Sequence, residues 1–314
     1  MLTTPQGLSE IPEASPVKAI TILILCWSFS PPAQGQIFSL SKERMIEFTK
    51  HDSYERFPDG RPKVPLNLIE WLAELSVEEA WGVLRSKGYM KQYADGFEML
   101  KPGQRLVGRA VTAQYLPHRP DLEEVVDVDA EKKGLARGNT QKVVDALIRD
   151  DVAVVDLMGA APGHNFGGDN LHSAIWGQTR RGAVVDGTIR DLQGTFDLPL
   201  NIFYKKAHPA AVSGVLMVAL NIPVEISGAV AMPGDVVLGD GEGLIFIPPH
   251  LVEAVLERAD SIHIKDEWTK DKLITGQYRA SDLYGSKLSL EMQKDFDEFK
   301  AKRMKEIEAA RSNQ

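Results

Sequence analysis

Two short apolar runs constrain the fold of this chain more than any other feature. Residues 152–158 read VAVVDLM, and residues 182–187 read GAVVDG. Both runs are too short for a buried helix and are rich in valine, so they predict strands that are buried on both faces. Residues 171–181, between them, predict a helix. Alternation of this kind favours an α/β fold.

Further strands and helices are expected on both sides of this unit. The expected strands are 105–116, 201–204, 224–226, 236–238 and 244–247, and the expected helices are 67–89 in two pieces, 139–149, 250–268 and 288–310. Ser76 and Glu79 form a predicted capping box at the start of the second piece, and Gly88 ends it. The many short strands after residue 201 favour a mixed, partly barrel-like sheet over a doubly wound one.

Composition excludes several classes of protein. The 314 residues carry a formal net charge of -8, and the Lys/Arg-rich stretch at 300–311 is interleaved with glutamate. Binding to nucleic acid requires clustered Lys and Arg, so no nucleic-acid partner is predicted. The single cysteine, Cys26, excludes an internal disulfide and a zinc ribbon. No apolar run reaches the roughly 18 to 20 residues that span a membrane.

The N-terminal region resembles an export signal. Residues 19–27 (AITILILCW) form a short apolar run after Lys18, and small residues precede Gln36, where cleavage is expected. The acidic residues among the first sixteen do not fit such a signal, and a true start at Val17, from an alternative start codon, would remove them. We therefore predict export. The alternative is a cytoplasmic protein whose disordered leader carries a short hydrophobic anchor.

The first candidate for a binding site lies just before the helix expected at 171–181. Gly167, Gly168, Asp169 and Asn170 precede this helix. Glycines let the backbone approach a ligand closely, and the first amides of a helix have no partner within it, so such a place can bind a carboxylate or a phosphate. By itself, the segment better fits an ordinary glycine turn with Asp169 as the N-cap.

The second candidate segment, 186–191 (DGTIRD), lies at the carboxyl end of the next expected strand, where α/β folds place ligands. Arg190 offers a planar fork for a carboxylate or carbonyl oxygen, and Asp191 offers a hard oxygen ligand for Mg²⁺ or Mn²⁺. By itself, the pair fits a local ion pair at the surface. Together the two segments predict a site for a metal-bound oxo acid.

Two other patterns do not support a site. The spacing of His164, Asp169 and His172 matches no zinc motif, so no zinc site is predicted there. Residues 239–243 (GDGEG) are similar to a nucleotide-binding loop, but a strand follows them where a helix is required. They are better interpreted as a hairpin turn.

Several motifs, in the same order along the chain, resemble the RraA-like family, whose members include 4-hydroxy-4-methyl-2-oxoglutarate aldolases. The resemblance covers 75–255, and its motifs are 107–112 (VGRAVT), 186–191 (DGTIRD), 223–224 (PV), and 233–237 (PGDVV) with Asp240 and Gly243. It implies a three-layer β/β/α, swivelling-domain-like fold that assembles as a homotrimer or hexamer with sites between subunits.

The resemblance implies how the first segment would act. The amides of Gly168, Asp169, Asn170 and Leu171 would hold the carboxylate of a 2-oxo acid substrate. Asp169 would also position a water for proton transfer. Asn170 stands where aldolases of the family often have an apolar residue. Family sites also use an acid from a neighbouring subunit, which the sequence does not identify.

The resemblance also implies that the second segment would supply the charged side chains of the site. Arg190 would bind the substrate and stabilise the developing enolate oxygen. Asp191 would hold Mg²⁺ or Mn²⁺, partly through waters, and the ion would act as a Lewis acid. The implied activity is retro-aldol cleavage of 4-hydroxy-2-oxo acids, such as 4-hydroxy-4-methyl-2-oxoglutarate, to pyruvate. The same chemistry implies decarboxylation of oxaloacetate.

Asp191 also helps to distinguish between the possible functions of the protein. The ribonuclease-E-inhibiting branch of the family lacks the acid after the arginine, so Asp191 favours catalysis. A non-catalytic binding or regulatory protein is the alternative hypothesis, and Asp191→Ala would leave such a scaffold unaffected. Methyl transfer to a quinone precursor is a third, and the sequence has no cofactor loop that supports it.

The chain is expected to divide into four parts. These are a leader at 1–35, an N-terminal arm at 36–66, the RraA-like catalytic domain at 67–264 and a C-terminal helical extension at 265–314. The extension could wrap around a neighbouring subunit or lie in solvent.

Overall fold

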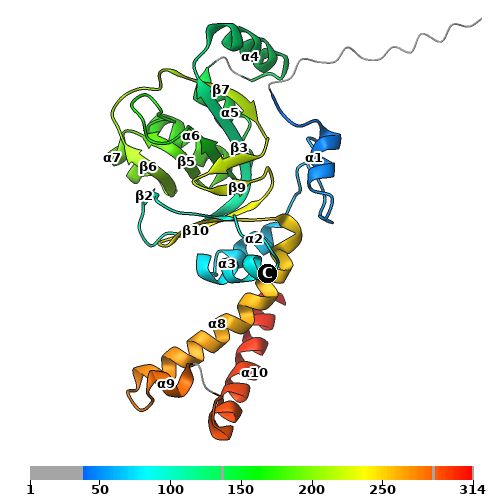
Figure 1. Cartoon of the computed structure of the whole chain (residues 1–314), viewed down its shortest axis with the longest axis vertical. Helices are drawn as coiled ribbons and strands as arrows, with labels where there is room; N and C mark the ends of the chain where they lie inside the picture. Colours follow the sequence, from blue (N-terminus) through cyan, green and yellow to red (C-terminus); the bar gives the residue numbers. More distant parts are fainter. Residues whose placement is uncertain (1–37, 136–137, 285–286, 313–314) are drawn as a thin grey trace, which may run out of the picture. The chain divides into compact units, whose positions relative to one another are not determined.

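The computed structural model describes residues 38–135, 138–284 and 287–312 (Figure 1). The predicted leader, with its apolar run and the start at Val17, lies outside the described residues. None of the helices in the described ranges is both long and apolar enough to cross a membrane. The boundaries of the arm and of the C-terminal extension stay predictions.

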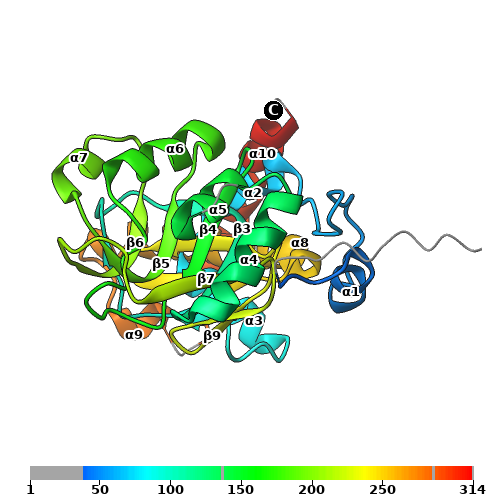
Figure 2. The same ribbon diagram turned by 90° about the horizontal axis from the view of Figure 1, so that it is seen from above.

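A nine-stranded mixed sheet forms the centre of the fold (Figure 2). The strands are β1 (Tyr93–Ala94), β2 (Glu98–Met99), β3 (Leu106–Pro117), β4 (Asp151–Asp156), β5 (Ala183–Ile189), β6 (Ile202–Ala207), β7 (Val215–Leu220), β10 (Val236–Asp240) and β11 (Gly243–Ile247). The order is β1-β11-β10-β3-β4-β5-β6-β2, and β7 pairs with β3. Strands β3 to β6 are parallel, while β7, β10 and β11 pair antiparallel. The predicted mixed α/β sheet is confirmed. It does not close into a barrel, because β1 and β2 stand at the two ends of the strand order.

Different layers cover the two faces of this sheet. The helices α4 (Pro120–Lys132), α5 (Asn139–Asp145) and α6 (Asp169–Thr179) cover one face. Here Val143 and Ile175 pack against Val185 in an apolar cluster. A hairpin of β8 (Val224–Ile226) and β9 (Ala229–Ala231) covers the other face, where Ile226 packs in a cluster with Val184. Helices, sheet and hairpin form the expected three-layer β/β/α arrangement.

A second group of helices packs at the β10–β11 part of the sheet. It consists of α2 (Leu66–Leu72), α3 (Val77–Ser86), the short η1 (Pro249–Leu251) and α8 (Val252–Ile274). Ala80 and Val255 pack in one buried cluster with Ile245 of β11. The predicted capping box at α3 is confirmed, because the Ser76 amide donates to Glu79 Oε2 at 2.7 Å and the Glu79 amide donates to Ser76 Oγ at 3.2 Å.

The C-terminal helices fold back on α8. The elements are α9 (Ala280–Leu283) and α10 (Leu290–Ser312). The Trp268 indole N–H on α8 donates to Asp295 Oδ2 on α10 at 2.7 Å. The Trp268 ring also lies 5.2 Å, centroid to centroid, from the Phe296 ring. Part of the apolar surface of α10 is therefore packed against α8 of the same chain.

The structure differs from the sequence prediction in several elements, among them β7 and α7 (Leu192–Phe196), which the sequence analysis did not expect. The arm contains α1 (Lys42–Phe48) and packs on the domain, since buried Arg61 lies 3.6 Å from Asp151. The helix α4 was not predicted, because only Val126, Asp129 and Ala130 of its residues are buried and its apolar stripe is weak. The helix α5 ends at Asp145, four residues before the predicted end at 149.

Candidate functional site

A strap of residues 164–168 lies beside the end of β5 and leads into the candidate site. The Phe166 amide donates to the Thr188 carbonyl at 2.9 Å, and the Arg190 amide donates to the Gly167 carbonyl at 3.0 Å. Because these bonds alternate between the two segments, the strap continues the parallel sheet past the end of β4. It thereby sets the start of α6 next to the end of β5.

Gly168 and Asp191 approach each other closely. A methyl group on Gly168 would lie 2.0 Å from Asp191 Oδ2 and 3.2 Å from Arg190 Cγ, so the contact requires glycine. Asp191 has a φ of 55°, in the left-handed region, which Asp and Asn tolerate better than most residues. Its Oδ2 lies 3.4 Å from Arg190 Nε, and the Arg190 and Asp191 side chains are 41% and 48% exposed. Both charged groups are therefore accessible to a ligand.

The start of α6 provides backbone donors beside these charges. Gly168 is the N-cap of the helix. The Asn170 amide donates to Asp169 Oδ1 at 2.8 Å, so it is partly engaged. The amides of Gly168, Asp169 and Leu171 have no acceptor among the described residues. Three backbone donors at the positive end of a helix dipole are thus available to a carboxylate.

The helix α7 (Leu192–Phe196) packs against the start of α6 through a second glycine. A methyl group on Gly194 would lie 2.5 Å from Asp169 Oδ2 and 3.1 Å from Asp169 Cβ. The two contacts are reciprocal. Asp191, which precedes α7, packs against Gly168 at the start of α6, and Asp169 of α6 packs against Gly194 of α7. These two contacts fix the spacing of the two aspartates.

His172 connects the same two helices from inside the protein. Its ring is fully buried, and its Nδ1 lies 2.8 Å from Thr195 Oγ1 on α7. Burial lowers the pKa of His172 to about 4, against a smaller attraction from Asp169. The ring is therefore neutral at pH 7. It serves to position α7, and with it Asp191, relative to α6.

Acid should destabilise the protein through His172. Its pKa is about 4 in the folded state and 6.5 as the reference value. The unfolded chain therefore binds the proton first as the pH falls from 6.5 towards 4, and stability is lost in this window. At pH 5 the loss from this group is about 2 kcal/mol. We expect the free energy of unfolding, from urea titrations, to fall by that much more between pH 7 and pH 5 in the native protein than in His172→Asn.

The control for this experiment is His118→Asn, because the His118 side chain is 38% exposed and lies outside α6 and α7. This variant should keep the pH dependence of the native protein. Equal pH dependence in His172→Asn and the native protein would contradict the role assigned to the buried ring. Absolute stabilities do not enter the comparison, since only the change between the two pH values is compared.

The described residues offer few metal ligands at this site. They contain no group of three or more His, Cys, Asp or Glu side chains arranged to hold an ion. His164 Nδ1 lies 3.2 Å from the Gly159 carbonyl, and His172 faces Thr195. A cation here would have Asp191 and waters as ligands, which is the pattern that Mg²⁺ accepts.

The structure brings the six candidate residues to one place, where α6 begins and β5 ends: Gly168, Asp169, Asn170, Leu171, Arg190 and Asp191. Gly194 and Thr195 also contribute to this site, and nothing in the sequence predicts their part in it. Both lie in the short helix α7, and their contacts are with residues more than twenty positions earlier in the chain. Contacts between residues so far apart leave no recognisable pattern in the sequence around either residue.

The RraA-like family, described as aldolase/RraA, matches residues 74–246. Protein DlpA of Legionella pneumophila is 26% identical over 214 residues, which cover 67% of this chain and 32% of DlpA. A Thermus thermophilus protein named 4-hydroxy-4-methyl-2-oxoglutarate aldolase is 27% identical over 108 residues, which cover 34% of this chain and 65% of that protein. This chain thus spans about a third of DlpA.

A solved structure has the same fold. Streptomyces coelicolor RraAS2, from the RNase ES inhibitor RraA protein family, superposes with a TM-score of 0.58 and 23% identity. The superposition covers 67% of this chain and all of RraAS2. Because the family match covers more than half of the chain and includes both segments of the candidate site, the chain belongs to the RraA-like family.

Proposed function

We propose that this protein is a divalent-metal-dependent lyase, which cleaves 4-hydroxy-2-oxo acids such as 4-hydroxy-4-methyl-2-oxoglutarate and releases pyruvate. The main support is the close approach of Gly168 to Asp191, which places an accessible carboxylate and Arg190 beside the free amides of α6. The name of the Thermus thermophilus relative supports the same reaction class.

The residues present fit a divalent ion. The Asp191 carboxylate is about half exposed, and among the described side chains it forms an ion pair with Arg190 at 3.4 Å. Because Gly168 has no side chain, the carboxylate can lie directly beside the start of α6. Asp191 would hold Mg²⁺ or Mn²⁺, with waters as the other ligands. When bound, the ion supplies Lewis-acid polarisation of the substrate's 2-oxo group.

The protein groups would do the rest of the chemistry. The amides of Gly168, Asp169 and Leu171 bind the substrate carboxylate. The 4-hydroxyl loses its proton, the bond between carbons 3 and 4 breaks, and carbon 3 takes up a proton, so that 4-hydroxy-4-methyl-2-oxoglutarate yields two molecules of pyruvate. Arg190 stabilises the negative charge that develops on the 2-oxo oxygen. Asp169 holds the water that carries the proton.

Two further properties belong to the same proposal. Oxaloacetate would lose CO₂ through the same enolate, because its C3–carboxylate bond occupies the position of the C3–C4 bond. The protein would assemble as a homotrimer or hexamer, with a neighbouring subunit adding an acid to each site. A sedimentation experiment that finds only monomers would contradict this assembly.

The test is pyruvate release from 4-hydroxy-4-methyl-2-oxoglutarate and from oxaloacetate, followed with lactate dehydrogenase. We expect release with Mg²⁺ or Mn²⁺, its loss with a chelator and its return with added metal. Folded protein that releases pyruvate from neither substrate with metal present would contradict the proposal. It would favour the alternative of a non-catalytic binding protein of this family, and a search for bound partners would follow.

A further inference from the structure

A pocket lies far from the candidate site, between α3, β1 and the turn that joins β10 to β11. It has a volume of about 290 Å³ and is lined by Val77, Glu78, Trp81, Tyr93 and Glu242. In the sheet, β10, β3 and β4 lie between β11 and β5. At about 4.8 Å per strand, the pocket is roughly 19 Å across the sheet from Arg190 and Asp191.

Hydrogen bonds hold the walls of this pocket in place. The Asp240 carboxylate accepts from the Val77 amide and from the Glu242 amide, each at 2.9 Å, and so joins α3 to the turn. The Tyr93 hydroxyl donates to the Glu242 carbonyl at 2.7 Å. Gly243, with a φ of 141°, permits the close packing, since a methyl group there would lie 3.0 Å from Tyr93 Cε2. The pocket is therefore formed before any ligand binds.

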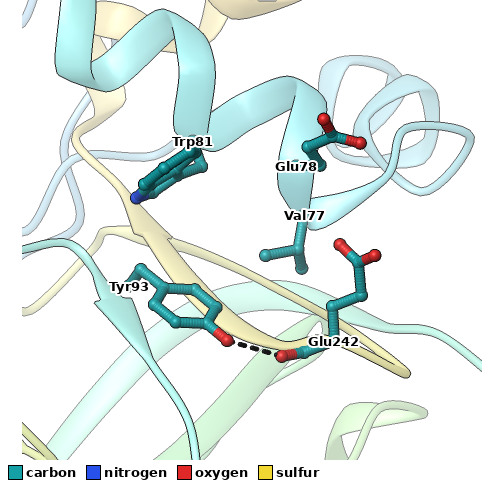
Figure 3. Close-up of a pocket in the computed structure, with 5 residues that line it drawn as sticks. All are labelled: Val77, Glu78, Trp81, Tyr93 and Glu242. Atoms are coloured by element: carbon teal, nitrogen blue, oxygen red, sulfur yellow. Dashed lines mark hydrogen bonds between the residues drawn. The ribbon is translucent and has the colours of Figure 1, made fainter.

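The lining of the pocket is mainly apolar and includes two aromatic rings, and two carboxylate side chains stand at its rim. Figure 3 shows the rings of Trp81 and Tyr93 on one side of the pocket and the carboxylates of Glu78 and Glu242 on the other. No Lys or Arg is among the residues that line it. The Arg85 guanidinium, outside the pocket, already lies 4.4 Å from the Trp81 ring centroid. One cation thus already contacts this ring, and a ligand in the pocket would meet the part of the Trp81 side chain that lines it.

We propose that this pocket binds an organic cation, an alkylammonium group that contacts Trp81 and Tyr93 and is neutralised by Glu78 and Glu242. Aromatic faces attract ammonium groups through the ring quadrupole, and the carboxylates at the rim add direct attraction. The ammonium group can belong to a free amine or to a lysine side chain of another protein. This site is independent of the proposed lyase activity.

Calorimetric titration of the full chain with choline tests the charge preference directly. The matched probe is 3,3-dimethyl-1-butanol, which has the shape of choline without its charge. We expect choline to bind at least about fivefold more tightly than the alcohol at constant ionic strength. Equal binding of the two, or no binding of choline, would overturn the proposal.

Variants of the lining residues test whether choline binds in this pocket, and a second titration tests where the natural ammonium group comes from. Trp81→Leu and Glu242→Gln should each weaken choline binding by about fivefold or more, while Glu70→Gln, on α2 outside the pocket, should not. Unchanged binding in Trp81→Leu would overturn the assignment of the pocket. A parallel titration compares Nα-acetyl-lysine methylamide with n-butylamine, which carries the same primary ammonium group without the peptide groups. Tighter binding of the lysine derivative assigns the site to protein lysines, and equal or weaker binding assigns it to free amines.

Discussion

Asp191→Asn should reduce metal-dependent pyruvate release by more than about 10²-fold without unfolding the protein. The substitution removes the charge that would hold the cation but keeps the size of the side chain. Asn is chosen because Asp191 has a φ of 55°, and Asn tolerates this left-handed backbone nearly as well as Asp. In Asp191→Ala, a loss of activity would be mixed with backbone strain.

The matched control is Asp197→Asn, at the other end of the same short helix. Asp197 is the C-cap of α7 and is exposed. It should retain activity within about twofold, since it lies outside the site. Initial rates across a range of Mg²⁺ and Mn²⁺ concentrations would be measured for both variants, together with their melting temperatures. Full activity of folded Asp191→Asn would exclude Asp191 as the metal ligand.

Gly168→Ala should have the second largest effect, because one methyl group would occupy the space of the Asp191 carboxylate. The new Cβ would lie 2.0 Å from Asp191 Oδ2 and 3.2 Å from Arg190 Cγ, so both charged side chains must move. The backbone of Gly168 has a φ of -122°, which alanine adopts freely, so the effect is steric. A displacement of about 1 Å at a reacting group is enough to lower the rate on the order of 10²-fold.

Gly177→Ala, in the same helix, separates this effect from the general consequences of replacing glycine. A methyl group on Gly177 would meet nothing within 4 Å. Because alanine favours the helix interior over glycine, this variant should be more stable by about 0.5 to 1 kcal/mol and fully active. The measurements are pyruvate release and thermal unfolding. Similar activities of the two variants would show that the Gly168–Asp191 approach has no part in the reaction.

Some of this structure follows from local sequence. The capping box at Ser76 and Glu79 involves residues three positions apart, and the hairpin that places Asp240 opposite Gly243 joins adjacent strands. The strand β5 was expected from its run of apolar residues, although the structure extends it to Ile189 through pairing with β6. In each case the decisive contacts lie close together in the chain.

Other parts could not be predicted, because their contacts join distant segments. The strap at 164–168 has no strand pattern of its own, and it becomes part of the sheet only beside Thr188. The strand β7 pairs with β3, roughly a hundred positions away, so the sequence around it carries no sign of its partner. The candidate residues themselves were recognised from motifs, but the contact between Gly194 and Asp169 needed the folded chain.

The reciprocal contacts between the glycines and aspartates of α6 and α7 make residues 164–196 a unit for protein engineering. Gly168 accommodates Asp191 and Gly194 accommodates Asp169, so neither helix has the correct shape without the other. If only one of the two helices were transferred to another open α/β sheet, one aspartate would lose the glycine against which it packs. Transfer of the strap, α6, β5 and α7 together would carry the spacing of both carboxylates intact, and with it the geometry on which a new activity could be built.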